Sequence, residues 1–322
     1  MMLSTKPKIE LSGDIEKIDA ITEQLCEFAK PYQSRCIVIL DPFISVLEDK
    51  IIQFFYKKFK ITQVKIKHPS VLAWQRPLLL ALNLKDTFER DVLRYTIDQA
   101  LSELNPQNLC KNGTRHYSGW VFTHSNIQNI AEDFAYLSLQ KIYKTNQLLR
   151  FYDPAVLPQL LTILNTQLQI KLLGHIEIWT LLDGNGDLFY RHNDQPSMVY
   201  TGQLGITKQL EQEINCIGIN NQFLKKYRKT HPLEKINECE SLNKIKPCLL
   251  RLMSRGFTDN ALLVEWAKVA YMWGKDFDLH PYVQNKIQNM KTRFDFTTLL
   301  NKINSPDWQI ILNQDLSEQK NK

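Results

Sequence analysis

The stretch from Leu148 to Leu157 constrains the fold most, because it joins an apolar segment, two opposite charges and helix-starting residues. Asp153 suits a helix N-cap, and Pro154 suits the first helical position, where no N–H donor is needed. The apolar residues that follow recur at helical spacing: Val156, Leu157, Leu160, Leu161, Leu164 and Leu168. We predict a strand over 149–152, a helix directly after it, and an ion pair between Arg150 and Asp153. An ordinary strand-to-helix junction explains the same pattern.

Apolar runs elsewhere predict further strands and helices. Arg35–Leu40 is a continuous apolar run that is typical of a central strand. The other expected strands are Val64–Lys67, Trp120–Thr123 and a hairpin of 176–182 with 187–191. The expected helices are 15–30, 43–54, 87–104 and one after Ser125, which with Gln128 forms a capping box. Strands that alternate with helices predict an α/β (α+β) lobe with a mixed sheet.

The pattern changes near Gln195-Pro196, and beyond about Ile206 only helical patterning is found. Pro232 and Pro247 are expected to divide this region, and Thr258 and Gly274 to cap one of its helices. We therefore predict three regions: a leader and helix at 1–34, an α/β domain at 35–195, and an all-helical C-terminal lobe at 196–322.

The bulk properties favour a protein kept in the cytoplasm. Six cysteines occur without a C-x-x-C pair, which favours buried thiols in a reducing compartment over a zinc site. Charged residues interrupt the N-terminal segment, so no secretory signal is predicted, and no apolar run is long enough for a membrane span. The net charge of +6 is dispersed, with short clusters such as 225–229, so nucleic-acid binding is not predicted.

No motif in the chain predicts catalysis, a cofactor or a metal. Asp183-Gly184-Asn185-Gly186-Asp187 resembles the start of a calcium loop, but Leu188 occupies the position that needs glycine, so a tight hairpin turn is favoured. His192 together with Asp194 could hold a metal or act as a base, although a lone histidine near a strand end is usually structural. The other histidines considered are His116, His124 and His175.

Several segments together resemble a known family. An Arg-Phe-Tyr-Asp-Pro core at 150–154 is followed by an apolar helix and by Ile176-Glu177-Ile178-Trp179. Upstream, Cys36–Asp41, Pro77–Leu82 and Gly119–Ser125 follow in the family's order, with Leu78 in place of an aromatic residue. This series resembles the adaptor–chaperones of type VI secretion effectors (the Tap adaptor family) over roughly residues 35–195.

The resemblance implies a non-enzymatic adaptor without a cofactor, whose partners are a cognate toxic effector and the spike protein VgrG. The family-motif residues it implies are Arg150, Phe151, Tyr152, Asp153, Pro154 and Trp179. We expect them to support the fold first, with direct partner contact as the alternative. Trp74 and Trp308 lie outside regular apolar patterns and are the candidates for an exposed interface anchor.

Two other functions remain open from the sequence. One is a cytoplasmic hydrolase or transferase with a site between the two lobes. The other is a nucleic-acid-binding regulator, which would bind DNA with a steep salt dependence.

Overall fold

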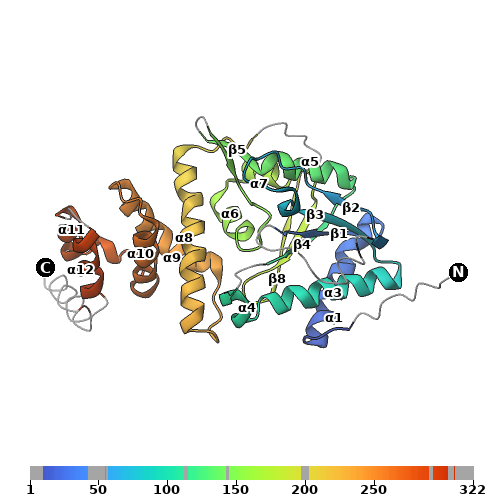
Figure 1. Cartoon of the computed structure of the whole chain (residues 1–322), viewed down its shortest axis with the longest axis horizontal. Helices are drawn as coiled ribbons and strands as arrows, with labels where there is room; N and C mark the ends of the chain where they lie inside the picture. Colours follow the sequence, from blue (N-terminus) through green and yellow to red (C-terminus); the bar gives the residue numbers. More distant parts are fainter. Residues whose placement is uncertain are drawn as a thin grey trace. The chain divides into compact units, whose positions relative to one another are not determined.

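The computed structural model describes residues 10–42, 55, 57–111, 115–142, 145–196, 203–289, 293–303 and 308. Figure 1 shows a strand-and-helix region followed by a succession of helices. This confirms an α+β N-terminal region and a helical C-terminal part. The helix expected over 43–54 lies outside the described residues.

A six-stranded sheet organises the N-terminal region, in the order β2-β3-β1-β4-β7-β8. Its strands are β1 (Arg35–Leu40), β2 (Ile61–Gln63), β3 (Leu78–Asn83), β4 (Tyr117–Phe122), β7 (Ile178–Leu182) and β8 (Leu188–His192). Every neighbouring pair is antiparallel, so the mixed pairing expected from the sequence is wrong. The alternation of strands and helices along the chain does not determine the direction in which two distant strands meet.

Several boundaries differ from those expected. The strand expected over 64–67 lies at Ile61–Gln63 instead, and the strand expected over 149–152 ends at Leu148. The latter is β6 (Thr145–Leu148), which forms a separate hairpin with β5 (Leu139–Ile142). The predicted bounds were wrong by a few residues in both cases. Buried residues just outside a strand have the same apolar pattern as the strand itself.

Helices lie on both faces of the sheet (Figure 1). One face carries α1 (Ile15–Ala29) and α3 (Thr87–Glu103), and the other carries α5 (Ile127–Leu137), α6 (Leu157–Ile163) and α7 (Thr166–Leu173). The N-cap of α5 is Asn126, whose side chain accepts from the Asn129 amide at 2.8 Å, and not Ser125 as expected. The short helix α4 (Pro106–Lys111) follows α3.

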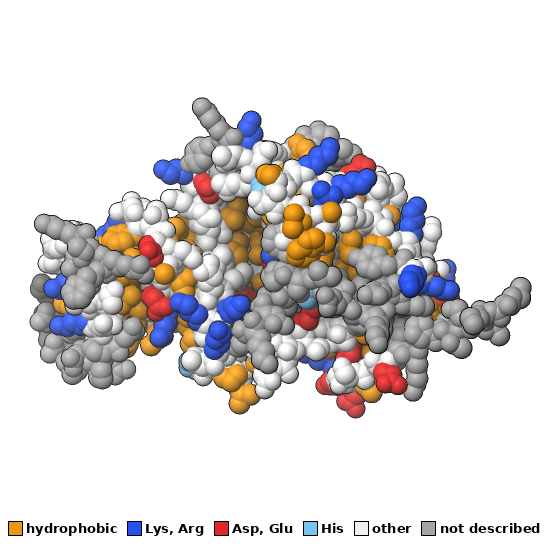
Figure 2. Space-filling model, in the orientation of Figure 1, with side chains coloured by type: hydrophobic (Ala, Val, Ile, Leu, Met, Phe, Trp, Pro, Cys, Tyr) orange, Lys and Arg blue, Asp and Glu red, His pale blue; other side chains and the backbone are white. Residues whose placement is uncertain are grey.

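The segment between β2 and β3 is strongly exposed. It contains the short 3₁₀ turn η2 (Ala73–Gln75), and Leu72 and Trp74 are 54% and 45% exposed. A hydrogen bond of 2.9 Å from the Gln63 side chain to the Ala73 carbonyl holds this turn beside β2. Figure 2 shows hydrophobic side chains next to Lys and Arg side chains over the region where Figure 1 labels β2 and β3.

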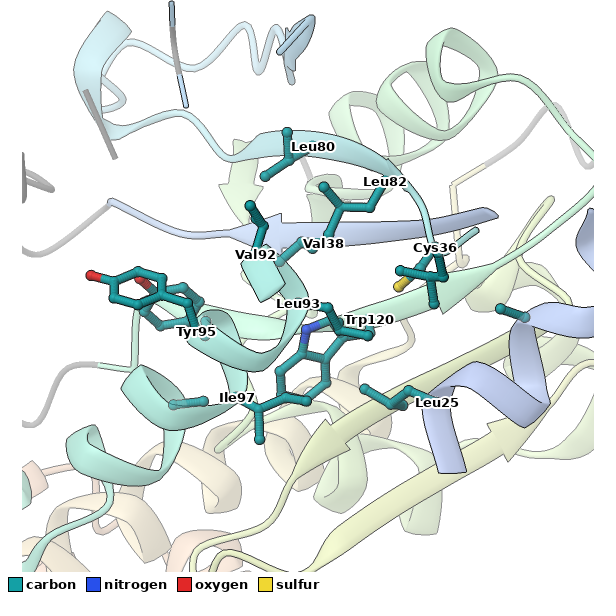
Figure 3. Close-up of a cluster of buried hydrophobic side chains, with 14 of the residues drawn as sticks. Leu25, Cys36, Val38, Leu80, Leu82, Val92, Leu93, Tyr95, Ile97 and Trp120 are labelled. Carbon is teal, nitrogen blue, oxygen red and sulfur yellow. The ribbon is translucent and has the colours of Figure 1, made fainter. Parts of the chain in front are cut away.

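The core beneath α1 and α3 is formed by alternate residues of the central strands (Figure 3). Cys36 and Val38 of β1 face Leu80 and Leu82 of β3, and all four side chains are at most 1% exposed. Trp120 of β4 is fully buried among them, and its indole N–H donates to the Thr96 hydroxyl at 2.9 Å. The period of two along each strand therefore gives this face a continuous apolar surface.

The C-terminal helices are α8 (Lys208–Thr230), α9 (Glu238–Ser254), α10 (Asn260–Trp273), α11 (Pro281–Gln288) and α12 (Arg293–Ile303). Pro232 lies between α8 and α9 as expected, but Pro247 lies inside α9. The buried residues Leu242, Ile245, Leu249 and Leu252 keep this helix continuous around the proline. Gly274 ends α10 as expected, whereas its N-cap is Asp259 in place of Thr258.

The chain divides into two compact units. The first extends to Glu211 and includes Arg228–Asn237, and the second comprises Gln212–Tyr227 and the chain from Glu238 onward. The division passes through α8, and the boundary expected near Gln195 stays a prediction.

Candidate functional site

Arg150 holds together two segments that are far apart in the sequence. Its guanidinium lies 2.5 Å from the Asp41 carboxylate, just after β1, and 3.2 Å from Asp153. The expected contact with Asp153 is therefore present, but the shorter contact is with Asp41, which the sequence analysis did not pair with it. The Asp41 side chain is 1% exposed, so this ion pair is largely removed from water. A buried pair of this kind ties the end of β1 to the turn after β6.

The charges of this cluster change the pKa values of its members. Burial opposes the charge on Arg150, but Asp41 and Asp153 more than offset it, so the pKa of Arg150 is raised. Burial and then the Asp41 charge raise the pKa of the Tyr152 phenol. Tyr152 therefore stays protonated and Arg150 charged across the neutral range, as in a static structural contact.

The residues after Arg150 form a turn and not the first turn of a helix. Helix α6 begins at Leu157, and its N-cap, Val156, offers no side-chain cap. The Asp153 carboxylate accepts from the Ala155 amide at 2.9 Å, while the Asp153 carbonyl accepts from Val156 and Leu157. The expected N-cap at Asp153 and first helical position at Pro154 are therefore wrong. Asp153 instead closes a local turn around Pro154, which is itself buried.

The aromatic members of the motif are part of the core. Phe151, Tyr152 and Trp179 are fully buried. Trp179 stacks on Phe134 of α5 with ring centroids 5.2 Å apart, and Tyr152 stacks on the same ring at 5.9 Å. These contacts join the turn at 151–152 to β7 and α5. The structure thus brings the six motif residues into one region, and their role in supporting the fold stays a prediction.

The two tryptophans chosen as interface candidates behave differently. Trp74 is 45% exposed at η2, in agreement with the expectation. Trp308 is fully buried, so its expected exposure is wrong. It packs against His280 and Tyr282, with ring centroids at 5.1 and 6.0 Å, and such long-range aromatic contacts leave no local sequence pattern.

Three histidines are held by carboxylates in one recurring arrangement. Glu103 contacts the ring and the backbone N–H of His116, at 2.7 and 2.8 Å. Glu177 holds His124 in the same way, at 2.9 and 2.8 Å, and Asp133 holds His175 at 2.6 and 3.0 Å. Because each carboxylate binds ring and backbone of one residue, these pairs fix loop geometry.

His192 lies elsewhere, on the edge strand β8. Its ring centroid is 5.6 Å from that of Tyr190 and 6.2 Å from that of Phe28. Within the described ranges, no group of three or more His, Cys, Asp or Glu residues is placed to hold a metal ion.

The segment that resembles a calcium loop is the turn between β7 and β8. The Asp183 carboxylate accepts from the amides of Asn185 and Asp187 at 2.8 and 3.0 Å. Gly186 has φ of 78°, a conformation that glycine adopts without strain. The predicted hairpin is therefore confirmed, and Asp183 is engaged by the turn itself.

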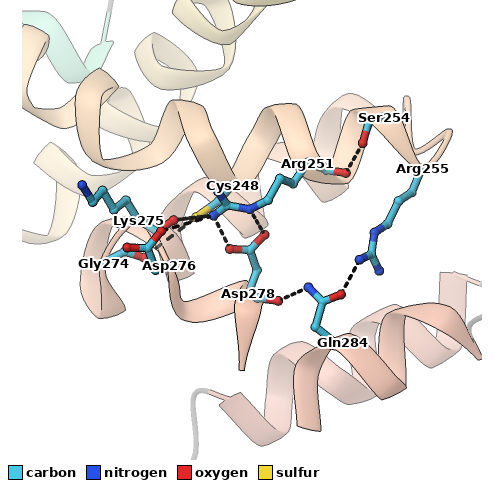
Figure 4. A network of polar contacts seen from close by, with 9 residues as sticks. All are labelled: Cys248, Arg251, Ser254, Arg255, Gly274, Lys275, Asp276, Asp278 and Gln284. Carbon is cyan, nitrogen blue, oxygen red and sulfur yellow. Dashed lines mark hydrogen bonds and ion pairs between the residues drawn. The ribbon is translucent and has the colours of Figure 1, made fainter. Parts of the chain in front are cut away.

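In the second unit, a polar network joins α9 to the segment around Asp278 (Figure 4). Arg251 of α9 binds both carboxylate oxygens of Asp278, at 2.8 and 2.5 Å, and the Asp278 side chain is 3% exposed. The Cys248 thiol donates to the Lys275 carbonyl at 2.9 Å. Burial and the Asp278 charge raise the pKa of this thiol, which disfavours the reactive thiolate.

A run of basic residues near β2 was not predicted as a functional feature. Residues 57–76 contain five lysines and one arginine but no aspartate or glutamate. Lys60, Lys65 and Lys67 are exposed around β2, next to the exposed Leu72 and Trp74. The uninterrupted absence of acidic residues was the signal, and it was overlooked because the net charge was weighed over the whole chain.

No protein-family model, no curated protein and no solved structure matches this chain. None of the helices in the described residues is both long enough and apolar enough to cross a membrane.

Proposed function

We propose that this protein is a cytoplasmic adaptor–chaperone that binds a toxic effector of a type VI secretion system and helps to load it onto the VgrG spike. The proposal comes from the resemblance at 35–195, and it requires no cofactor. In this role the protein acts by binding, and its partners are the effector and the spike.

One structural observation supports the proposal most. The segments that carry the resemblance are spread over about 140 residues of sequence, yet they are neighbours in the sheet. They supply β1, β3, β4 and β7, which follow one another as β3-β1-β4-β7. Arg150 of the motif adds the ion pair to Asp41 at the end of β1. The position of these segments side by side in one sheet supports the proposal that they act as one unit.

The buried position of the motif agrees with a protein that works through its surface. Arg150, Tyr152 and Asp153 contact one another and Asp41, and the aromatic members are fully buried. In this proposal the motif supports the scaffold, and the partner contacts fall on exposed residues elsewhere on the surface.

The test is co-expression of the full chain with the product of the adjacent downstream gene, followed by affinity capture and size-exclusion chromatography. We expect a stoichiometric complex, and a partner that is soluble only when both are expressed. A parallel capture uses the product of a neighbouring spike gene. Failure to bind either product would overturn the proposal and direct attention to an enzymatic activity.

A further inference from the structure

The part of the molecule around β2 combines charge, exposure and a strand that, among the described residues, lies at the edge of the sheet. We call it the β2 surface and define it by Lys60, Lys65, Lys67, Leu72 and Trp74. All five side chains are exposed. Lys65 and Lys67 alternate with the buried Val64 and Ile66, so the segment directs its apolar side chains inward and its ammonium groups to solvent.

Within the described part of the chain, the lysines of this surface have no charge partner. Among the described residues, no ion pair or hydrogen bond joins Lys60, Lys65 or Lys67 to another group. By contrast, Lys226 and Lys246 of the second unit bind Glu265 and Glu213. A cluster of unpaired positive charges attracts an acidic partner and raises its rate of encounter.

The edge position of β2 favours a partner in extended conformation. β2 is the last strand of the sheet, and its residue Thr62 pairs with Leu79 of β3. The Val64 amide donates to the Pro77 carbonyl at 2.8 Å, which sets the phase of the ladder. In this phase the backbone groups of Ile61 and Gln63 point away from β3, toward the open edge. No described residue bonds to these outward groups.

We infer that the β2 surface binds an extended acidic segment of a partner protein, which adds a strand to the β2 edge. Its carboxylates would meet Lys60, Lys65 and Lys67, and an apolar side chain would pack on Leu72 and Trp74. An extended peptide uses main-chain hydrogen bonds for affinity and alternate side chains for specificity. The strand edge favours a peptide over a nucleic acid or a lipid surface, because neither of these supplies the alternating N–H and C=O groups that a strand ladder needs. The inference rests on the proposed function only for the identity of the protein that carries the segment, an effector or a spike.

The experiment uses the full chain and a labelled peptide of alternating Glu and Val, followed by fluorescence anisotropy. We expect saturable binding that weakens as the salt concentration rises. The charge-reversed variant K60E/K65E/K67E should bind about tenfold more weakly, as three lost ion pairs of modest strength imply. The matched control K225E/K229E/K268E reverses three exposed lysines elsewhere and should bind as the native chain does.

A second probe tests the strand pairing without altering the protein. The same peptide with N-methyl groups on alternate amides keeps its charges but loses the donors that a strand edge requires. We expect the native chain to bind the N-methylated peptide more weakly than the unmodified one. The Trp74→Ala variant should bind the unmodified peptide more weakly than the native chain does. Equal binding of the two peptides, or an equal loss in both triple variants, would overturn the inference. Tighter binding of a single-stranded oligonucleotide or of phosphatidylserine vesicles at the same lysines would overturn it as well.

The outcomes separate this inference from the proposed function. Peptide binding that depends on Lys60, Lys65 and Lys67 supports the surface even if the adjacent gene product is not captured. Capture of that product by K60E/K65E/K67E at native yield, without peptide binding by the native chain, would overturn the surface and leave the adaptor proposal intact.

Discussion

At the scale of single residues, Arg150 joins two segments of the first unit that lie 109 residues apart in the chain. Its guanidinium lies 2.5 Å from the Asp41 carboxylate and 3.2 Å from the Asp153 carboxylate. Because the Asp41 side chain is 1% exposed, loss of this cation would leave a buried negative charge poorly compensated.

Replacement of Arg150 by alanine should destabilise the protein without a selective loss of binding. The change removes the cation beside a carboxylate that is 1% exposed, at a cost of about 3–5 kcal/mol. Urea unfolding measures this cost, and Arg94→Ala is the control, because its pair with Asp19 is more exposed and should cost less than about 1 kcal/mol. An Arg150→Ala protein with native stability that no longer captures its partner would assign Arg150 to the interface instead.

Alkaline pH should weaken the fold in part through Tyr32. Burial, together with the nearby Glu177, raises the pKa of Tyr32 to about 12. An unfolded chain loses this proton near pH 10, so stability falls as the pH rises from about 10 through 12. Tyr32→Phe removes the ionisable group, and its free energy of unfolding should fall less between neutral pH and about pH 11. An identical loss in both proteins would show that Tyr32 does not contribute to the pH dependence.

At the scale of elements, the sequence predicted the presence of helices and strands better than the way in which the strands pair. β1, α1, α3 and the β7–β8 hairpin follow from apolar periodicity and turn residues, which act over a few positions. The antiparallel order β2-β3-β1-β4-β7-β8 depends on contacts between distant segments, and local patterns do not contain it. The candidate site followed the same division. The motif residues were found from the sequence, but the Arg150–Asp41 pair and the position of the 57–76 lysines beside an edge strand required the assembled sheet.

Gly119 is the residue on which the contact between β4 and β7 depends most. It has φ of 137°, and an added Cβ would lie 2.2 Å from the Thr180 carbonyl oxygen. Gly119→Ala should therefore separate the two strands and cost several kcal/mol, about the size of a severe core defect. Gly218→Ala is the matched control, because its Cβ would meet open space in α8 and should add about 0.5–1 kcal/mol. Thermal unfolding should show a lower melting temperature for Gly119→Ala and a slightly higher one for Gly218→Ala.

At the scale of the whole molecule, the two compact units should respond separately to mutation. Arg251 and Asp278 brace only the second unit, while Arg150 and Asp41 brace only the first. A compact unit with its own internal contacts can open without the rest of the chain. The placement of the division inside α8 was not predictable from composition, because that helix has one continuous pattern across both units.

Arg251→Ala should lower hydrogen-exchange protection within the second unit alone. We expect faster exchange in α9 and α11 and unchanged exchange in β1, β3 and β4, because the lost contacts join α9 to the segment around Asp278. Mass spectrometry of the exchanged protein resolves these segments. Equal loss of protection in the central strands would mean that the whole chain unfolds as one cooperative unit.

The strand order also has a consequence for biosynthesis. β1 lies inside the sheet, yet both of its neighbours, β3 and β4, come later in the chain. The ribosome therefore releases an apolar strand with two unpaired edges. One edge can pair only after Asn83 has been synthesised, and both only after Phe122. Pairing between strands that are distant in the sequence slows folding, and until it is complete the apolar strand is exposed to aggregation. Synthesis rate and general chaperones should thus control the yield of this protein before any partner meets it.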